Sequence, residues 1–556
     1  MNVATGRDHL IGMSIGVIYV AALMTTAGDL ALSRDESFYV DASQMTAQWI
    51  QLLFDQPLVA LTRASVDHFW SYNHEHPGLM KTLAGMMWIA QMKWQVFPRD
   101  SLAFRFAGMT CTGLLLWLLY IFGTRLHNRI VGVASVFGFA LLPRIFYHAH
   151  LHAFDIPIVF FVTLVVYCYW RSLTQKRWAL WTALAYGLAL DTKHNSWLLP
   201  LVLGTHWAWF RTGRSRRAAP LVARMPWALL GMVTLSPVIF VGSWPWLWHD
   251  TLRRIANYIN FHTHHAAHHG IINVEYFGKN IVHPPFPVSV PFVLTAMTVP
   301  FTFLVFSLLG VGIRSRHLVP DWITRILRRK VPNREDMLFS DVLIFGCFLA
   351  PLLLIALPNT PKFGGTKHWF PAYPFMAIYF GVGVDYVWNA LKEWASVGWR
   401  FPRRLAHLVV IPLCLAPSLA ETIHSHPMAL SHYTMLAGGV SGAADLGMTR
   451  QFWGYTTGSV TEFLKQRLPE GGSVWICDTT FGAWAMLQRD GVVPRNIRAT
   501  SDMAAADYIL VHHELHFAEV DFQAWVALKS TQPVHVLTFD GVPIISIYES
   551  DKHRSR

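Results

Sequence analysis

The chain has 556 residues, of which 53% are hydrophobic and only 14% are Asp, Glu, Lys or Arg. Soluble globular domains contain about 25% charged residues, so this composition excludes an ordinary soluble protein. The 45 Lys and Arg residues outnumber the 33 Asp and Glu residues, but they lie in short clusters between apolar runs. A basic stripe of the kind that binds nucleic acid is not present, and we expect no nucleic-acid partner.

Long uncharged apolar runs recur along the chain and predict membrane-spanning helices. The first run covers residues 11–26, lacks a small-x-small cleavage site and is expected to stay as a signal anchor. Similar runs follow at residues 104–123, 156–170, 225–241, 288–312, 342–357 and 409–420.

The basic clusters between these runs predict the orientation of the chain. They occur at residues 125–129, 171–177, 211–224, 314–334 and 392–404. If each cluster faces the cytoplasm, the runs form about eleven spans, with the N-terminus inside and the C-terminus outside. The run at residues 77–97 contains Lys81, Gln91, Lys93 and Gln95, and we interpret it as an outer interfacial or re-entrant helix.

The character of the sequence changes after residue 421. Strand-like runs at residues 473–477, 508–512, 534–539 and 543–548 alternate with helix-like runs at residues 460–467, 481–489 and 522–528. We therefore predict a mainly α fold, a polytopic transmembrane helical bundle at residues 1–421 with a small α/β domain outside at residues 422–556. The chain has no Asn-x-Ser/Thr sequon, which favours a bacterial inner membrane.

Under this topology, many polar side chains gather at the outer ends of the helices. Charged groups are costly inside a bilayer, so their concentration on one side indicates an interfacial active site. The groups that face outward are Arg34, Asp35, Glu36 and Asp41; Asp67, Asn73, His74, Glu75, His76 and Lys81; His148, His150, His152 and Asp155; Asp191, Lys193, His194 and Asn195; residues 249–283; and Lys362, Lys367 and His368.

Several of these groups belong to short motifs that follow one another along the chain. The motifs are Arg34-Asp35-Glu36-Ser37-Phe38-Tyr39, His76-Pro77-Gly78-Leu79-Met80-Lys81, Arg105, Phe154-Asp155-Ile156-Pro157, Thr192-Lys193-His194-Asn195, Lys367-His368-Trp369-Phe370-Pro371-Ala372-Tyr373-Pro374, Gly438-Gly439-Val440-Ser441-Gly442-Ala443 and Trp453-Gly454. In order, spacing and side of the membrane they resemble the GT-C superfamily, glycosyltransferase family 39 type, which holds protein O-mannosyltransferases and lipid A aminoarabinose transferases. The resemblance covers roughly residues 10–460. It departs from the family pattern at Gly78, where a second proline is frequent, and at His150, where an arginine is frequent.

The resemblance implies a membrane glycosyltransferase that moves one sugar from a polyprenyl-phosphate carrier to an acceptor on the extracytoplasmic face. It also implies inversion of the anomeric carbon in a single displacement. Relatives modify protein hydroxyls, lipid A phosphates or cell-envelope glycans, so the acceptor, a protein, lipid or glycan, stays open. Because a phosphate leaves readily as an anion, the reaction needs a base for the acceptor and positive charge for the phosphate.

These needs assign the candidate site residues. Asp35 is the candidate base, and Asp155 is expected to orient the acceptor or to hold the loop that contains Asp35. Three simpler interpretations stay open: Asp35 and Glu36 as the start of an ordinary solvated loop, Asp155 as a helix cap, and Lys193 and Lys367 as anchors that reach the headgroups. The predicted catalytic residues are Asp35, Glu36 and Asp155, and the predicted substrate-binding residues are Arg34, Glu75, His76, Lys81, Arg105, His150, Lys193 and Lys367.

A histidine-rich segment at residues 262–269 raises a metal hypothesis. Its pairs four residues apart would project to one side of a helix, as zinc ligands do, although most such segments are simply solvated. A second hypothesis, suggested by metal dependence in relatives, places a divalent ion near the donor phosphate, bound by Glu75 with His265 or His283.

Two other classes of protein remain as alternatives. A lipid-linked oligosaccharide ligase or polymerase would carry a large arginine-rich outer loop, which the sequence lacks. A transporter or flippase would place a charge at the midplane of the membrane and would tolerate replacement of Asp35 by Asn.

Overall fold

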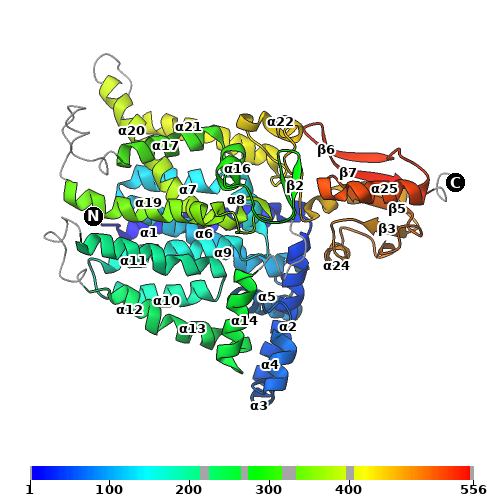
Figure 1. Ribbon diagram of the computed structural model, residues 1–556, viewed down its shortest axis with the longest axis horizontal. Coiled ribbons are helices and arrows are strands. Elements are labelled where there is room, and N and C mark those ends of the chain that lie inside the picture. Colours follow the sequence, from blue (N-terminus) through cyan, green and yellow to red (C-terminus); the bar gives the residue numbers. More distant parts are fainter. Residues whose placement is uncertain (1–2, 213–224, 265–272, 316–333, 396–405, 551–556) are drawn as a thin grey trace.

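The computed structural model describes residues 3–212, 225–264, 273–315, 334–395 and 406–550. Long helices run side by side along the longest axis, and a small β-sheet domain lies at one end of them (Figure 1). The N-terminus lies toward the end of the helical part that is remote from this sheet (Figure 1). The predicted fold class, a mainly helical bundle with a small C-terminal α/β domain, is confirmed.

The helical part contains most of the chain. Its elements are α1 (Gly6–Thr26), η1 (Ala27–Asp29), α2 (Arg34–Asp55), α3 (Pro57–Ala60), α4 (Arg63–Trp70), α5 (Leu79–Trp94), α6 (Asp100–Leu126), α7 (Arg129–Ala140), α8 (Pro143–His150), α9 (Asp155–Ser172), α10 (Trp178–Leu190), η2 (His194–Leu198), α11 (Leu199–Thr212), α12 (Trp227–Thr234), α13 (Ser236–Ser243), η5 (Pro245–Leu247), α14 (Thr251–Thr263), β1 (Val274–Tyr276), β2 (Lys279–Ile281), α16 (Val290–Thr298), α17 (Phe301–Ser315), α19 (Arg334–Ala356), η6 (Gly365–Ala372), α20 (Tyr373–Ala395) and α21 (Ala406–Ser425).

The chain is an integral membrane protein. Within the described residues, four helices are long and apolar enough to cross a membrane: Gly6–Asp29, Asp100–Leu126, Asp155–Ser172 and Phe339–Ala356. A fifth span results if α7 and α8, which bend by 71° at their junction, cross together. This count is lower than the predicted eleven because some predicted runs form shorter apolar helices, such as Trp227–Ser243 and Phe301–Ser315.

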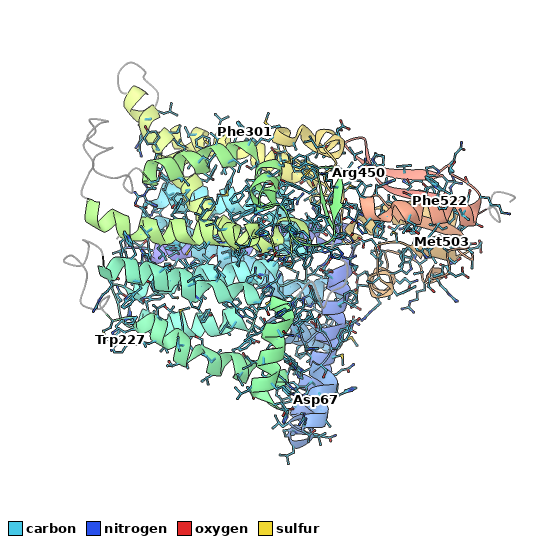
Figure 2. All side chains as sticks on the ribbon, in the orientation of Figure 1. Asp67, Trp227, Phe301, Arg450, Met503 and Phe522 are labelled. Atoms are coloured by element: carbon cyan, nitrogen blue, oxygen red, sulfur yellow. The ribbon has the colours of Figure 1, made fainter. Side chains whose placement is uncertain are left out.

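The helices α2, α4 and α14 run across the direction of the long helices, on the side that faces the sheet domain (Figure 1). Ion pairs connect α14 to α4, because Arg254 of α14 contacts Asp67 of α4. Asp67 also forms an ion pair with Arg63. Figure 2 shows Asp67 far from the long helices. The run predicted to be interfacial forms α5, which packs against α2 and α6.

The end of the long helices that is remote from the sheet domain carries basic residues. Arg129 forms an ion pair with Asp8 at the start of α1, with 2.6 Å between Nε and Oδ1. The ammonium of Lys176 lies 4.0 Å from the ring centroid of Trp227, which Figure 2 places at the end remote from the sheet. The structure therefore separates these basic groups from the C-terminal domain.

The C-terminal domain is built around a five-stranded sheet in the order β4-β3-β5-β7-β6. β4, β3 and β5 are parallel, and β7 pairs antiparallel with both β5 and β6. Alternate residues of β5 point to opposite faces: Ile509 packs with α25, whereas Leu510 packs with α23 and α24. The elements are η7 (Met435–Ala437), α22 (Gly439–Asp445), η8 (Tyr455–Val460), α23 (Thr461–Arg467), β3 (Gly472–Ile476), α24 (Phe481–Arg489), β4 (Ile497–Thr500), β5 (Tyr508–His512), η9 (Leu515–Phe517), α25 (Ala518–Leu528), β6 (His535–Phe539) and β7 (Val542–Glu549).

Candidate active site

A cavity of about 650 Å³ lies between the helical part and the C-terminal domain. Segments that are far apart in the sequence meet around it. Its lining residues are Arg34, Asp35, Phe38, Tyr39, Tyr72, Asn73, Glu75, His76, Lys193, His194, Phe261, His262, Asn273, Phe363, Gly364, Lys367, His368, Phe452, Trp453, Glu514 and His516.

Asp35 and Lys367 face each other in this cavity. Asp35 lies in the first turn of α2, and its side chain is 26% exposed. The Lys367 ammonium is 3.4 Å from Asp35 Oδ2 and 3.8 Å from the ring centroid of Trp453. Burial lowers the pKa of Lys367, while the neighbouring carboxylates of Asp35 and Asp155 oppose that shift. The arrangement places one accessible carboxylate beside one largely buried cation.

A sharp turn before η6 brings Lys367 to this position. Gly364 and Gly365 both have positive φ, of 71° and 64°, which glycine adopts without steric cost. A Cβ at Gly364 would also lie within van der Waals overlap of Lys367 Cε. These two glycines therefore allow the lysine to fold back over the turn.

A second acid and base pair lies beside the first. Lys193 Nζ donates to Asp155 Oδ1 at 2.7 Å, and both side chains are less than 10% exposed. Asp155 is the first residue of α9, where the helix dipole favours a carboxylate. Phe154 occupies the N-cap position and no side chain caps this helix end, so the interpretation of Asp155 as a cap is wrong.

Glu36 and Arg105 form a buried ion pair behind the cavity and do not line it. Arg105 Nε lies 2.9 Å from Glu36 Oε1, and each side chain is 1% exposed. The guanidinium also donates to the carbonyl oxygens of Leu30 and Ala31, and Glu36 accepts from the amides of Ser33 and His152. The pair thus holds the segment that leads into Asp35.

Lys81 and His150 also lie outside the cavity lining. Lys81 Nζ donates to the carbonyl oxygens of Asn73 and His76, at 2.9 and 2.7 Å, and so supports the loop that carries Glu75. Both ring nitrogens of His150 are engaged, one with Thr26 Oγ1 and the other with the Phe146 carbonyl oxygen. The structure therefore places five predicted site residues outside the cavity lining: Glu36, Lys81, Arg105, His150 and Asp155.

The loop at residues 73–76 contributes Glu75 and His76 to the cavity. Glu75 Oε1 accepts from Asn73 Nδ2 at 2.7 Å. His76 stacks on Phe154, and burial together with the nearby charge of Lys193 and Lys81 holds its pKa well below the usual range. His76 is therefore neutral near pH 7. One of its ring nitrogens can donate a hydrogen bond, and the other can accept one.

The predicted metal ligands are only partly described. His265 lies outside the described residues. His283 is exposed and is not part of the cavity lining that contains Glu75. The binding of a divalent ion by Glu75 with these histidines stays a prediction.

The C-terminal domain adds acidic residues that sequence reasoning missed. Arg34 Nη1 lies 2.5 Å from Asp478 Oδ1, which joins the first turn of α2 to the loop after β3. Glu514, after β5, lines the cavity, and its pKa is well above the usual range because of burial and the neighbouring carboxylates of Asp478 and Glu275. Asp478 and Glu514 both follow predicted strands closely, and this position could have identified them from the sequence.

Together these residues can bind an anion and activate a hydroxyl group. Lys193 and Lys367 supply two positive charges on one wall, and Asp35 supplies an accessible carboxylate next to them. Aromatic side chains such as Tyr39 and Trp453 form flat apolar walls nearby. A negatively charged leaving group and a polar acceptor fit such a site.

One known family is similar to part of this chain. The family model of the dolichyl-phosphate-mannose-protein mannosyltransferases matches residues 81–244. This segment contains Arg105, Asp155 and Lys193, and the match confirms the predicted resemblance to GT-C glycosyltransferases. No curated protein sequence matches the chain.

Two solved structures are similar to the chain over nearly all its length. The structure of ArnT from Cupriavidus metallidurans bound to undecaprenyl phosphate is 13% identical, with 97% of each chain covered and a TM-score of 0.49. The archaeal oligosaccharyltransferase AglB from Archaeoglobus fulgidus, in complex with an inhibitory peptide and a dolichol-phosphate, is 11% identical with a TM-score of 0.48. That alignment covers 98% of this chain and 74% of AglB.

Proposed function

We propose that the protein is a membrane glycosyltransferase that transfers a sugar from a polyprenyl-phosphate donor to an acceptor on the extracytoplasmic face. Asp35 removes the proton from the acceptor hydroxyl, and the acceptor oxygen attacks the anomeric carbon with inversion. The bond from the anomeric carbon to the phosphate oxygen breaks, and the polyprenyl phosphate leaves as an anion. Lys193 and Lys367 stabilise the charge that develops on the phosphate.

The contact between Asp35 and Lys367 carries this proposal. A general base must lie close to the acceptor, and the phosphate must lie close to a cation, so the two groups have to be neighbours across the reacting carbon. The two groups face each other in one cavity, with 3.4 Å between Lys367 Nζ and Asp35 Oδ2, and the entering donor has to separate them. Asp155 supports the proposal as the carboxylate that holds Lys193 at the cavity wall.

An apolar groove supports the assignment of a lipid-linked donor. A second cavity, of about 450 Å³, lies between α11 and α19 and is lined by apolar side chains such as Leu201, Val202 and Val342. Leu198 lines this groove and lies in η2, the same short helix as His194, which lines the active-site cavity. A prenyl chain in this groove would direct its phosphate toward Lys193 and Lys367.

We further propose that the cavity opens to the outer side of a bacterial inner membrane, with the C-terminus outside. Arg129 and Lys176 lie at the end of the bundle remote from the C-terminal domain, and the positive-inside rule assigns that end to the cytoplasm. Labelling of a cysteine introduced at the exposed Phe522 by a membrane-impermeant maleimide in intact cells tests this orientation, and protection of that cysteine would contradict it.

The experiment that tests the function is a donor panel. Purified full-length protein in nanodiscs is incubated with several polyprenyl-phosphate sugars and candidate acceptors, and the released polyprenyl phosphate is measured. We expect protein-dependent release with at least one donor. A complete absence of release across donors and acceptors of all three classes, protein, lipid and glycan, would contradict the proposal.

Replacing Lys367 by methionine should weaken transfer strongly. The substitution removes a cation 3.4 Å from Asp35 while keeping an unbranched side chain of similar length. Loss of one charge-assisted contact to phosphate costs about 1.5–3 kcal/mol, so kcat/KM should fall by roughly ten- to hundredfold. The matched control is Lys279→Met, which removes an exposed lysine in β2 and should leave kcat/KM unchanged. Equal kinetics of both variants would exclude Lys367 from phosphate binding.

A further inference from the structure

A cluster of Glu275, Glu514 and His516 joins the C-terminal domain to β1 at the cavity wall. One ligand atom from each of the three side chains lies within 4.8 Å of the other two. His516 Nδ1 is 3.1 Å from Glu275 Oε1 and 3.6 Å from Glu514 Oε2. The cluster thus combines two carboxylates with one imidazole, drawn from two parts of the chain that are more than 200 residues apart.

The environment of this cluster holds three buried carboxylates near one guanidinium, that of Arg34. The side chains of Glu275 and Glu514 are 5% and 6% exposed. A third carboxylate, Asp478, is 2% exposed and lies next to Glu514. Arg34 contacts Asp478 through Oδ1, whereas Asp478 Oδ2 has no hydrogen-bond partner among the described residues. Buried carboxylates so close together are costly unless one of them holds a proton or a cation binds between them.

The position of the cluster on the sheet points to a ligand independently of its charge. Asp478 follows the carboxyl end of β3, and Glu514 follows the carboxyl end of its parallel neighbour β5. The chain passes from β3 to β4 on one side of β3 and then to β5 on the other side, so the strand order reverses between β3 and β5. Ligands of open α/β sheets bind at the carboxyl ends of the strands at such a reversal.

We propose that Glu275, Glu514 and His516 bind a divalent metal ion, with Asp478 as a further carboxylate near it. Two carboxylates and one imidazole suit Zn²⁺ or Mn²⁺ better than Mg²⁺ or Ca²⁺, which prefer oxygen ligands alone. The ion neutralises the cluster and links Glu514 and η9 to β1. Because Glu514 and His516 also line the cavity, the metal fixes the C-terminal domain as part of the cavity wall.

The site is separate from the histidine-rich segment, which offers other ligands. His262 at the start of that segment instead contacts the Glu75 carbonyl oxygen and stacks on His194. A test must therefore distinguish binding at the cluster from binding at His264, His265, His268 and His269. The variant in which all four of these are alanine serves as the background for that purpose.

The test measures metal binding without any donor, so its outcome is independent of the proposed transferase activity. Full-length protein in nanodiscs is stripped with EDTA, loaded with ZnCl₂ or MnCl₂ and desalted, and the bound metal is counted by mass spectrometry. We expect about one Zn²⁺ per chain in the four-alanine background and a metal-dependent rise in the melting temperature. Glu514→Gln and His516→Ala in this background should each weaken Zn²⁺ binding by at least about tenfold.

The visible spectrum of bound Co²⁺ gives a second readout that needs no ligand substitution. In the four-alanine background, we expect Co²⁺ absorption bands that disappear when Zn²⁺ is added. A background protein that binds neither Zn²⁺ nor Co²⁺ would overturn the proposal, and this result does not depend on whether the cluster variants fold. Unchanged Zn²⁺ binding in both Glu514→Gln and His516→Ala would overturn it as well.

Discussion

The Asp35→Asn variant should transfer sugar about 10²- to 10⁴-fold more slowly than the wild type, with little change in donor affinity. The amide keeps the shape of the carboxylate but cannot accept the acceptor proton, so the chemical step should fail while the cavity stays intact. The measurement is kcat and KM for the best donor of the panel, together with direct donor binding by native mass spectrometry.

The matched control for this substitution lies on the same helix. Asp41 is exposed and is not part of the cavity lining, so Asp41→Asn changes a carboxylate of α2 without touching the site. We expect wild-type kcat from this control. A kcat for Asp35→Asn within threefold of the wild type would exclude Asp35 as the base.

The Arg105→Met variant should lose about 3–5 kcal/mol of stability, because it leaves the Glu36 carboxylate buried without its ion-pair partner. The same change removes the donors that hold the carbonyl oxygens of Leu30 and Ala31, directly before α2. We expect a much lower melting temperature and a smaller protease-resistant fraction, measured on protein in detergent.

A double variant separates this structural role from phosphate binding. Glu36→Gln combined with Arg105→Met removes both charges and should be more stable than Arg105→Met alone, since no uncompensated charge stays buried. If Arg105 instead binds the donor phosphate, Arg105→Met should keep the wild-type melting temperature and raise the KM for donor.

Much of the secondary structure of the C-terminal domain could be predicted because its strands are visible as runs in the local sequence. The predicted run at residues 508–512 coincides with β5, and the run at residues 481–489 coincides with α24. β4 was missed because it is a four-residue edge strand with an exposed arginine, and only pairing with β3 makes it a strand. Short edge strands of this kind depend on tertiary contacts more than on local sequence.

The meeting of the charged groups could be predicted, but their individual roles could not. Topology places Asp35, Lys193 and Lys367 on one side of the membrane, and the structure brings them to one cavity. Glu36 and Arg105 also belong to the predicted motifs, yet the structure pairs them with each other behind the cavity wall. Which of two adjacent carboxylates faces the cavity depends on long-range packing, which spacing does not encode.

The contribution of the C-terminal domain to the site could not be predicted from the motifs. Asp478 and Glu514 follow strands whose order in the sheet is needed before their proximity becomes visible. Glu275 adds a residue from β1, and no local pattern connects it with Glu514. The junction of two parts of a chain is thus the region where sequence reasoning is weakest.

A donor labelled twice tests the central claim most directly. Polyprenyl phosphate carrying ³²P and a ³H-labelled sugar is incubated with the protein and the best acceptor of the panel. We predict that ³H moves to the acceptor while ³²P stays with the lipid, and that Asp35→Asn slows this separation by about 10²- to 10⁴-fold. Both labels remaining together on the lipid, or moving together to the acceptor, would contradict sugar transfer with release of the polyprenyl phosphate.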